Sequence, residues 1–96
     1  MPHYISLVNW TDQGIKNVKD TVKRTRDARA LAEKLGGKLQ VFYTLGEYDI
    51  VAVTEAPNDD VAMQFLLELG RLGNIRTKTL KAWTEDEAAA VVAKLS

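Results

Sequence analysis

Apolar residues dominate the stretch from Tyr4 to Trp10, where the side chains alternate between two sets, as expected of a strand whose two faces meet different surroundings. One set is Tyr4, Ser6, Val8 and Trp10, and the other is Ile5, Leu7 and Asn9. We predict this strand over residues 4–10. Between Ile15 and Leu35, apolar and small residues recur every three or four positions, which is typical of one stripe of an amphipathic helix. Gly36 and Gly37 would end this helix. The chain therefore begins with a strand and a long helix.

The middle of the chain has the pattern of a hairpin followed by a second helix. Strands are predicted at residues 38–43 and 48–55, and the segment 45–47 between them contains Gly46, which accepts the positive φ of a tight turn. Asn58 has the right position to cap the next helix, which Gly70 ends.

A last strand is predicted over residues 74–83, and Thr84 with Glu87 forms the capping-box pattern before a short C-terminal helix. This order of elements is that of a single α+β domain over residues 1–96, a ferredoxin-like βαββαβ fold with one added helix. A right-handed crossover between the first two strands leaves room for the third between them. We therefore predict a four-stranded antiparallel sheet in the order 4-1-3-2.

Both faces of this sheet carry apolar side chains. By parity, we assign to the helix-covered face Ile5, Leu7, Val51, Val53, Leu80 and Ala82. The opposite face would then carry Tyr4, Val8, Trp10, Tyr48, Ile50, Ala52, Thr79 and Trp83. A chain of 96 residues has no third layer to bury that face, and an exposed aromatic patch indicates a partner. We expect a homodimer or higher homo-oligomer with sheets packed face to face, as in a dimeric α/β barrel.

Composition narrows the chemistry. Thirteen Lys and Arg balance thirteen Asp and Glu, so no net charge favours nucleic acid or an anionic membrane. The absence of cysteine excludes disulfides and thiolate chemistry, and His3 is the only histidine, so we expect no metal site. No phosphate-binding glycine motif is present, and we expect no cofactor. The chain begins without a signal-peptide pattern and has no run of about 18 apolar residues, so we expect no membrane association and place it in the cytoplasm.

RNA binding has to be weighed because the RNA-recognition motif is also ferredoxin-like and stacks bases on aromatic side chains of its open face. Here Ile50 stands in place of the second aromatic residue, and Glu47 and Asp49 add negative charge beside it. We therefore expect no nucleic-acid partner.

The end of the first predicted strand and the beginnings of the third and fourth meet at one edge of the sheet. Five side chains with chemical handles converge there, and we call them the rim residues: Asn9, Trp10, Tyr48, Asp49 and Arg76. In one interpretation Asp49 is a general base, while Tyr48 orients a substrate and Arg76 holds an anion. In the other, Asp49 is structural and pairs with Asn9 and a helix start, because an unpaired buried charge is costly.

Three segments that together cover nearly the whole chain carry a family likeness: HYISLVNWTDQGIKNVKD, LAEKLGGKLQVFYTLGEYDIVAVTEAP and LGNIRTKTLKAWT. They resemble the GYD domain family, small ferredoxin-like proteins related to the dimeric α/β barrels. The namesake motif appears as Gly46, Tyr48 and Asp49, with Glu47 inserted within it. Dimeric α/β barrels include ligand-sensing modules and cofactor-free oxygenases, so the resemblance implies the fold and leaves the activity open.

Three hypotheses follow. The leading one is a homo-oligomeric module whose paired sheets enclose a cavity for a small organic ligand, contacted by Trp10, Tyr48, Asp49 and Arg76, with Asn9 behind them. The second is a cofactor-independent enzyme of oxygenase or isomerase type that uses the same cavity with Asp49 as its base. The third is a purely structural assembly protein with a dry, closed interface.

Overall fold

A single antiparallel sheet forms the centre of the protein, which is described here by a computed structural model of residues 1–96. Its strands are β1 (His3–Trp10), β2 (Lys38–Tyr43), β3 (Ile50–Glu55) and β4 (Ile75–Ala82). Their order is β2-β3-β1-β4, which is the predicted order read in reverse. The predicted α+β ferredoxin-like fold is confirmed.

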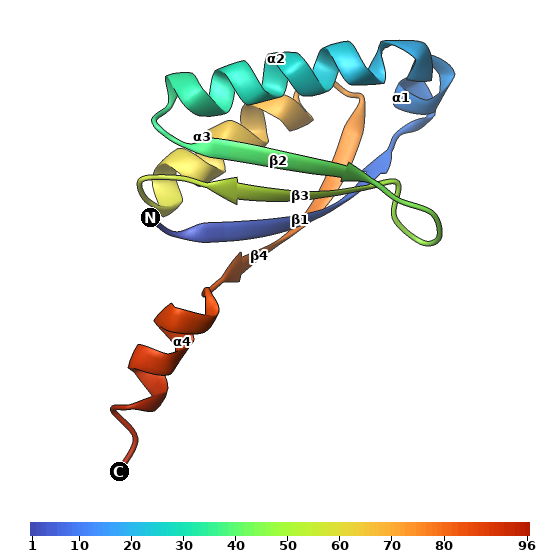
Figure 1. The fold of residues 1–96 in the computed structure, drawn as a ribbon. Helices are drawn as coiled ribbons and strands as arrows, with labels where there is room; N and C mark the ends of the chain where they lie inside the picture. Colours follow the sequence, from blue (N-terminus) through green and yellow to red (C-terminus); the bar gives the residue numbers. More distant parts are fainter.

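The helices lie on one side of this sheet, except for the last. They are α1 (Asp12–Lys16), the short 3-10 turn η1 (Val18–Asp20), α2 (Thr21–Lys34), α3 (Asp59–Gly70) and α4 (Glu85–Val92). In Figure 1, α2 and α3 cover the same face of the sheet, whereas α4 projects away from the body beyond the end of β4. None of these helices combines the length and hydrophobicity needed to cross a membrane.

The long helix predicted from Ile15 onward is broken in the structure. α1 ends at Asn17, whose φ of −105° and ψ of 32° are not helical, and α2 begins only at Thr21. Ile15 is 50% exposed and lies outside the core. Apolar residues continue at helical spacing through α1, η1 and α2, so the periodicity could not reveal the interruption.

The helix-covered face of the sheet is the opposite of the one we predicted. Tyr4, Ser6 and Val8 of β1 are at most 6% exposed, and they alternate with half-buried residues on the other face. In β3 the buried residues are likewise Ile50, Ala52 and Thr54 rather than Val51 and Val53. The assignment failed because both faces are apolar, so alternation could separate them but could not show which one the helices cover.

The uncovered side of the sheet, which we call the open face, is defined by Ile5, Leu7, Phe42, Val51, Val53 and Leu80. Ile5 lies opposite both Val53 and Leu80 in the strand register, and Leu7 lies opposite Val51. Phe42 is 50% exposed and Leu80 is 55% exposed. The open face is therefore still apolar, although its residues are not those predicted, and the reason to expect a partner there persists.

The C-terminal helix α4 starts as predicted. Thr84 accepts a hydrogen bond from the Glu87 amide, and the Glu87 carboxylate accepts one from the Thr84 amide, which completes the capping box. The bond from the Thr84 amide holds the pKa of Glu87 below its usual value. No residue of α4 is buried, and Val91 and Val92 are 52% and 60% exposed. The chain thus ends in a capped helix with an apolar surface that it does not cover itself.

Candidate functional site

The Asp49 carboxylate accepts hydrogen bonds from the last two residues of β1. Its Oδ2 accepts from the Trp10 backbone amide at 3.0 Å and from Asn9 Nδ2 at 3.4 Å. Asn9 Nδ2 also donates to the Glu47 carbonyl at 2.9 Å, which fixes the turn before Asp49. Gly46 adopts a φ of 108° in that turn, as predicted. The structure therefore brings Asn9, Trp10 and Asp49 together in bonds that hold the edge of the sheet.

The other two rim residues lie near this cluster without joining it. The Lys78 ammonium lies 5.9 Å from the centre of the Tyr48 ring, at a distance suited to a cation–π contact. Arg76 stands opposite Asn9 in the β1–β4 register and is exposed, and it forms no ion pair with Asp49. A role of the rim residues in binding or catalysis stays a prediction.

His3 lies between two carboxylates that sequence analysis did not place beside it. Its Nε2 is 3.5 Å from Glu55 Oε1, and its Nδ1 is 3.8 Å from Glu87 Oε1. These contacts connect β1 to β3 and to the first turn of α4. No group of three or more His, Cys, Asp or Glu side chains lies close enough to hold a metal ion.

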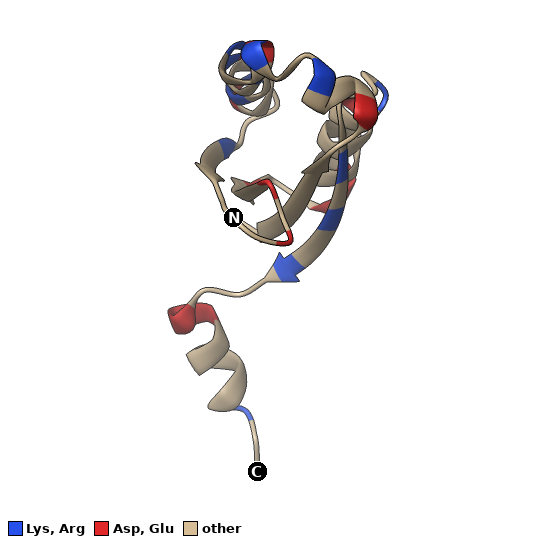
Figure 2. Ribbon diagram, turned by 90° about the vertical axis from the view of Figure 1, so that its right-hand side faces the viewer, with Lys and Arg blue, Asp and Glu red and all other residues tan.

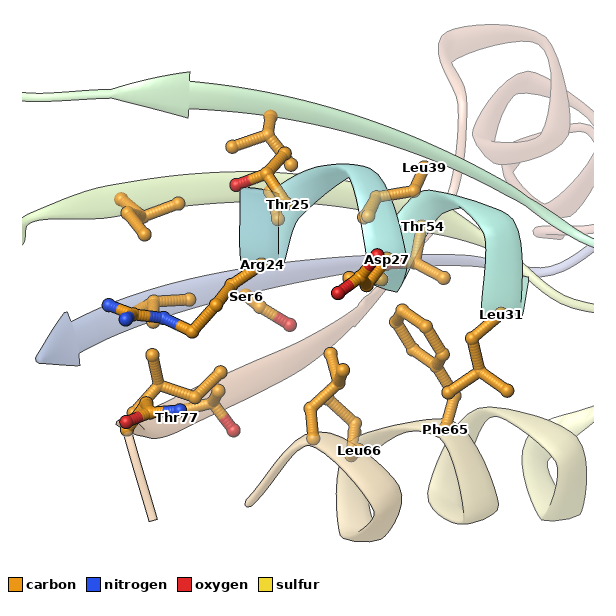
Figure 3. Close-up of a pocket in the computed structure, with 18 of the residues that line it drawn as sticks. Ser6, Arg24, Thr25, Asp27, Leu31, Leu39, Thr54, Phe65, Leu66 and Thr77 are labelled. Carbon is orange, nitrogen blue, oxygen red and sulfur yellow. The ribbon is translucent and has the colours of Figure 1, made fainter. Parts of the chain in front are cut away.

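The principal cavity, which we call the helix-side cavity, lies between the sheet and helices α2 and α3 and has a volume of about 250 Å³. Figure 3 shows Ser6 and Thr54 from the sheet, Leu31 from α2 and Phe65 from α3 around it. None of the rim residues lines it. The cavity therefore lies within a single copy of the chain, on the side of the sheet away from the open face.

The helix-side cavity exists because several of the side chains around it are small. Ser6, Ala28 and Ala52 face the region between α2 and α3, and the buried core is correspondingly divided into two clusters. One cluster contains Tyr4, while the other surrounds Phe65. Sequence analysis missed the cavity because it assigned this face to the outside. Small residues at alternate positions of the central strands are a signal that could have indicated it, once the faces were known.

Arg24 contributes the positive charge of the cavity wall. Its guanidinium donates to the Asn17 carbonyl at 3.0 Å and to the Gly14 carbonyl at 3.2 Å. Arg24 takes part in none of the five ion pairs of the chain. A guanidinium has five N–H donors, so several are left for another group. The helix-side cavity thus combines a mostly apolar wall with one fixed cation, Arg24, and two carboxylates, those of Asp27 and Glu68.

Comparison with known proteins places this geometry in context. The model of the GYD domain family matches residues 4–92. A curated protein of Thermus thermophilus, named "Glutamine synthetase and cystathionine beta-lyase binding protein", is 31% identical to the chain over 84 residues. This match covers 85% of the chain and 88% of the relative. No solved structure gives a significant match.

Proposed function

The chain belongs to the GYD domain family, and from that premise we propose that it is a homo-oligomeric protein-binding module whose open face joins two copies. The observation that carries the assembly is the apolar open face, which no element of the chain covers. The observation that favours binding over catalysis is the use of Asp49, the candidate base, in bonds that end β1.

A second copy is the occupant that best suits the open face. The central residues of the patch, Ile5, Leu7, Val51 and Val53, are uncharged, so two such faces can meet without burying unpaired charges. Lys78 stands beside Leu7 in the register at the margin, where its ammonium can stay in water. In a face-to-face dimer, each copy would cover the apolar open face of the other copy.

The C-terminal helix α4 contributes to the same proposed interface. Four strands of six to eight residues present roughly 400 Å² of sheet, about half of what each partner buries in a standard interface. Figure 2 shows acidic residues only in the first turn of α4, with the rest of the helix uncharged. Val91 and Val92 supply further apolar surface that a second copy can cover.

The assembly is tested by Leu80→Glu, which places a carboxylate on the open face, opposite Ile5 in the strand register. We expect sedimentation analysis to find a dimer for the native protein and a dissociation constant raised about a hundredfold or more for the variant. The matched control is Val22→Glu, since Val22 is 49% exposed on α2 and thus far from the open face. A native protein that stays monomeric at high concentration would contradict the proposal.

The assembled module is further proposed to bind another protein. Support comes from the Thermus thermophilus relative, whose name describes a protein that binds two enzymes. The first partners to test are therefore glutamine synthetase and cystathionine β-lyase from the source organism of this chain. Calorimetric titration of each purified enzyme should give saturable binding, with Val22→Glu as the control for the folded, assembled module. Absence of heat with both enzymes would remove these two partners from the proposal.

A small ligand at the edge of the paired sheets is a second candidate function. It is favoured by the aromatic ring of Tyr48 beside Lys78, with exposed Arg76 nearby, because an anionic or aromatic ligand suits that set. Tyr48→Ala and Arg76→Ala should then weaken binding of any small molecule that co-purifies with the native protein. The enzymatic alternative instead requires that Asp49→Asn abolish turnover of that molecule while the fold survives.

A further inference from the structure

We propose that the helix-side cavity binds a small monocarboxylate with an apolar body, whose carboxylate pairs with Arg24. This site lies on the side of the sheet opposite the proposed subunit interface. It therefore goes beyond the proposed function and does not depend on it.

The volume of the cavity requires an explanation. Protein interiors are packed as densely as organic crystals, and voids larger than a water molecule are few. A cavity of about 150 Å³ lined by Leu, Ile and Phe accepts benzene, so the 250 Å³ found here suits a ligand of about ten non-hydrogen atoms. An apolar site of this size in so small a chain is more consistent with a pocket than with a packing defect.

The apolar walls of the helix-side cavity favour a ligand with an apolar body. Leu31 of α2 and Phe65 and Leu66 of α3 face the sheet across the cavity (Figure 3). Two of the hydroxyl groups that line the cavity are already paired: Ser6 bonds Thr79 at 2.8 Å, and Thr25 bonds Tyr43 at 2.6 Å. Because these hydroxyls satisfy one another, they do not demand a polar ligand.

Arg24 selects the charge of the ligand. Its guanidinium is held by the Asn17 and Gly14 carbonyls, so its position is set before any ligand arrives. No carboxylate of the chain neutralises it. A carboxylate matches the planar donor geometry of a guanidinium, and charge-assisted bonds of this kind are among the strongest available. The preferred ligand therefore carries one carboxylate at the end that meets Arg24.

Two acids that line the cavity are compensated by neighbouring cations. Asp27 Oδ2 lies 3.7 Å from the Lys23 ammonium, and Glu68 Oε1 lies 3.7 Å from the Arg71 guanidinium. Both pairs are exposed to solvent, where their residual fields are screened. Arg24 is thus the uncompensated charge that an occupant of the cavity meets.

The test compares two probes of nearly equal size and shape, 3-phenylpropanoate and 3-phenylpropan-1-ol. We expect the carboxylate to bind the native protein at least tenfold more tightly than the alcohol in calorimetric titrations at neutral pH. In amide and methyl NMR spectra, the carboxylate should shift the resonances of Ala28 and Phe65, which contact the cavity, and leave those of Leu80 on the open face unchanged.

Variants of the protein test the contribution of the Arg24 charge separately from that of the cavity volume. Arg24→Gln should weaken the carboxylate about tenfold or more and leave the alcohol unaffected. Arg26→Gln is the matched control, because Arg26 is an exposed residue of the same helix that does not line the cavity, and it should change neither probe. Ala52→Leu should abolish binding of both probes by filling the cavity. Arg24→Lys, which keeps the charge, should retain part of the preference and serves as the charge test if Arg24→Gln does not fold.

The outcomes are decisive in both directions. The proposal is supported by a preference for the carboxylate that Arg24→Gln removes and Arg26→Gln preserves. It is overturned if neither probe binds, if the two probes bind equally well, or if the shifted resonances lie on the open face. Shifts on the open face would instead favour the ligand site proposed at the edge of the paired sheets, so the two proposals fail separately.

Discussion

Asp49 illustrates how one carboxylate can have two interpretations from sequence. Sequence analysis placed it correctly beside Asn9 and Trp10, because antiparallel pairing brings the end of β1 to the start of β3. Whether it acts on a ligand or holds the strand depends on which N–H groups point at it, and residue types alone do not specify this. The bonds to Oδ2 are made by groups of the sheet edge, so we expect a structural contribution that can be measured.

Asp49→Ala should lower the free energy of unfolding by about 1–3 kcal/mol, because the Trp10 amide would lose its acceptor. Glu47→Ala is the matched control, since Asn9 bonds the Glu47 carbonyl rather than its side chain. That control should change stability by no more than about 0.5 kcal/mol. Urea denaturation of both variants measures the difference. If Asp49→Ala were as stable as Glu47→Ala, a structural role of Asp49 would be contradicted and its catalytic interpretation favoured.

Gly14 marks a second residue where backbone contact decides the outcome. A Cβ atom at this position would lie 1.9 Å from the Asn74 carbonyl oxygen, the same oxygen that accepts the Thr11 amide. Gly14→Ala should therefore cost roughly 1–3 kcal/mol through forced displacement of α1 from the start of β4. Gly70→Ala provides the control, because nothing lies within 4 Å of its added Cβ and it ends a helix. Thermal melts should show a loss for the first and no loss for the second.

At the scale of elements, the sequence predicted the order of helices and strands but not the orientation of the sheet. The hairpin, the Asn58 cap and the Thr84–Glu87 capping box depend on local chemistry, which short stretches of sequence encode directly. The covered face depends on how helices dock, and here both faces of β1 are apolar. The helix-side cavity could not be predicted from the sequence for the same reason, because it is formed by small residues on the face that the helices cover.

Tyr4 connects three elements and makes the fold sensitive to high pH. Its hydroxyl donates to Asp59 at the start of α3, and Asp59 also pairs with Lys81 of β4 at 3.0 Å. Burial of the phenol, followed by the bond to Asp59, raises the pKa of Tyr4 from 10.0 to about 12. Folding therefore favours the protonated phenol, a contribution that is complete below pH 10 and is lost as the pH rises towards 12.

We accordingly expect the stability of the native protein to fall more steeply between pH 10 and pH 12 than that of Tyr4→Phe. The variant has no phenol at this position to titrate, while the remaining tyrosines and lysines titrate in both proteins. Chemical denaturation at a series of pH values measures both curves. Parallel curves would show that Tyr4 loses its proton equally readily in the folded and unfolded chains.

At the scale of the whole molecule, the exposed position of α4 is not explained by contacts within a single chain. The helix projects from the end of β4 with no buried residue, and the molecule measures 52 Å along its longest axis against 17 Å along its shortest. An isolated helix of eight residues is unstable in water, even when it is well capped. We therefore expect α4 to be ordered by contact with a second copy, so its order should depend on protein concentration.

Hydrogen exchange measures this dependence directly. Amides of α4 should gain protection as the protein is concentrated, whereas those of β1 in the centre of the sheet should be protected at every concentration. Val92→Glu should remove the gain in α4, because it introduces charge into the apolar surface of that helix, while Val22→Glu on α2 should preserve it. If α4 were equally protected in dilute and concentrated samples, its order would come from the single chain, and the proposed interface would have to form from the open face alone.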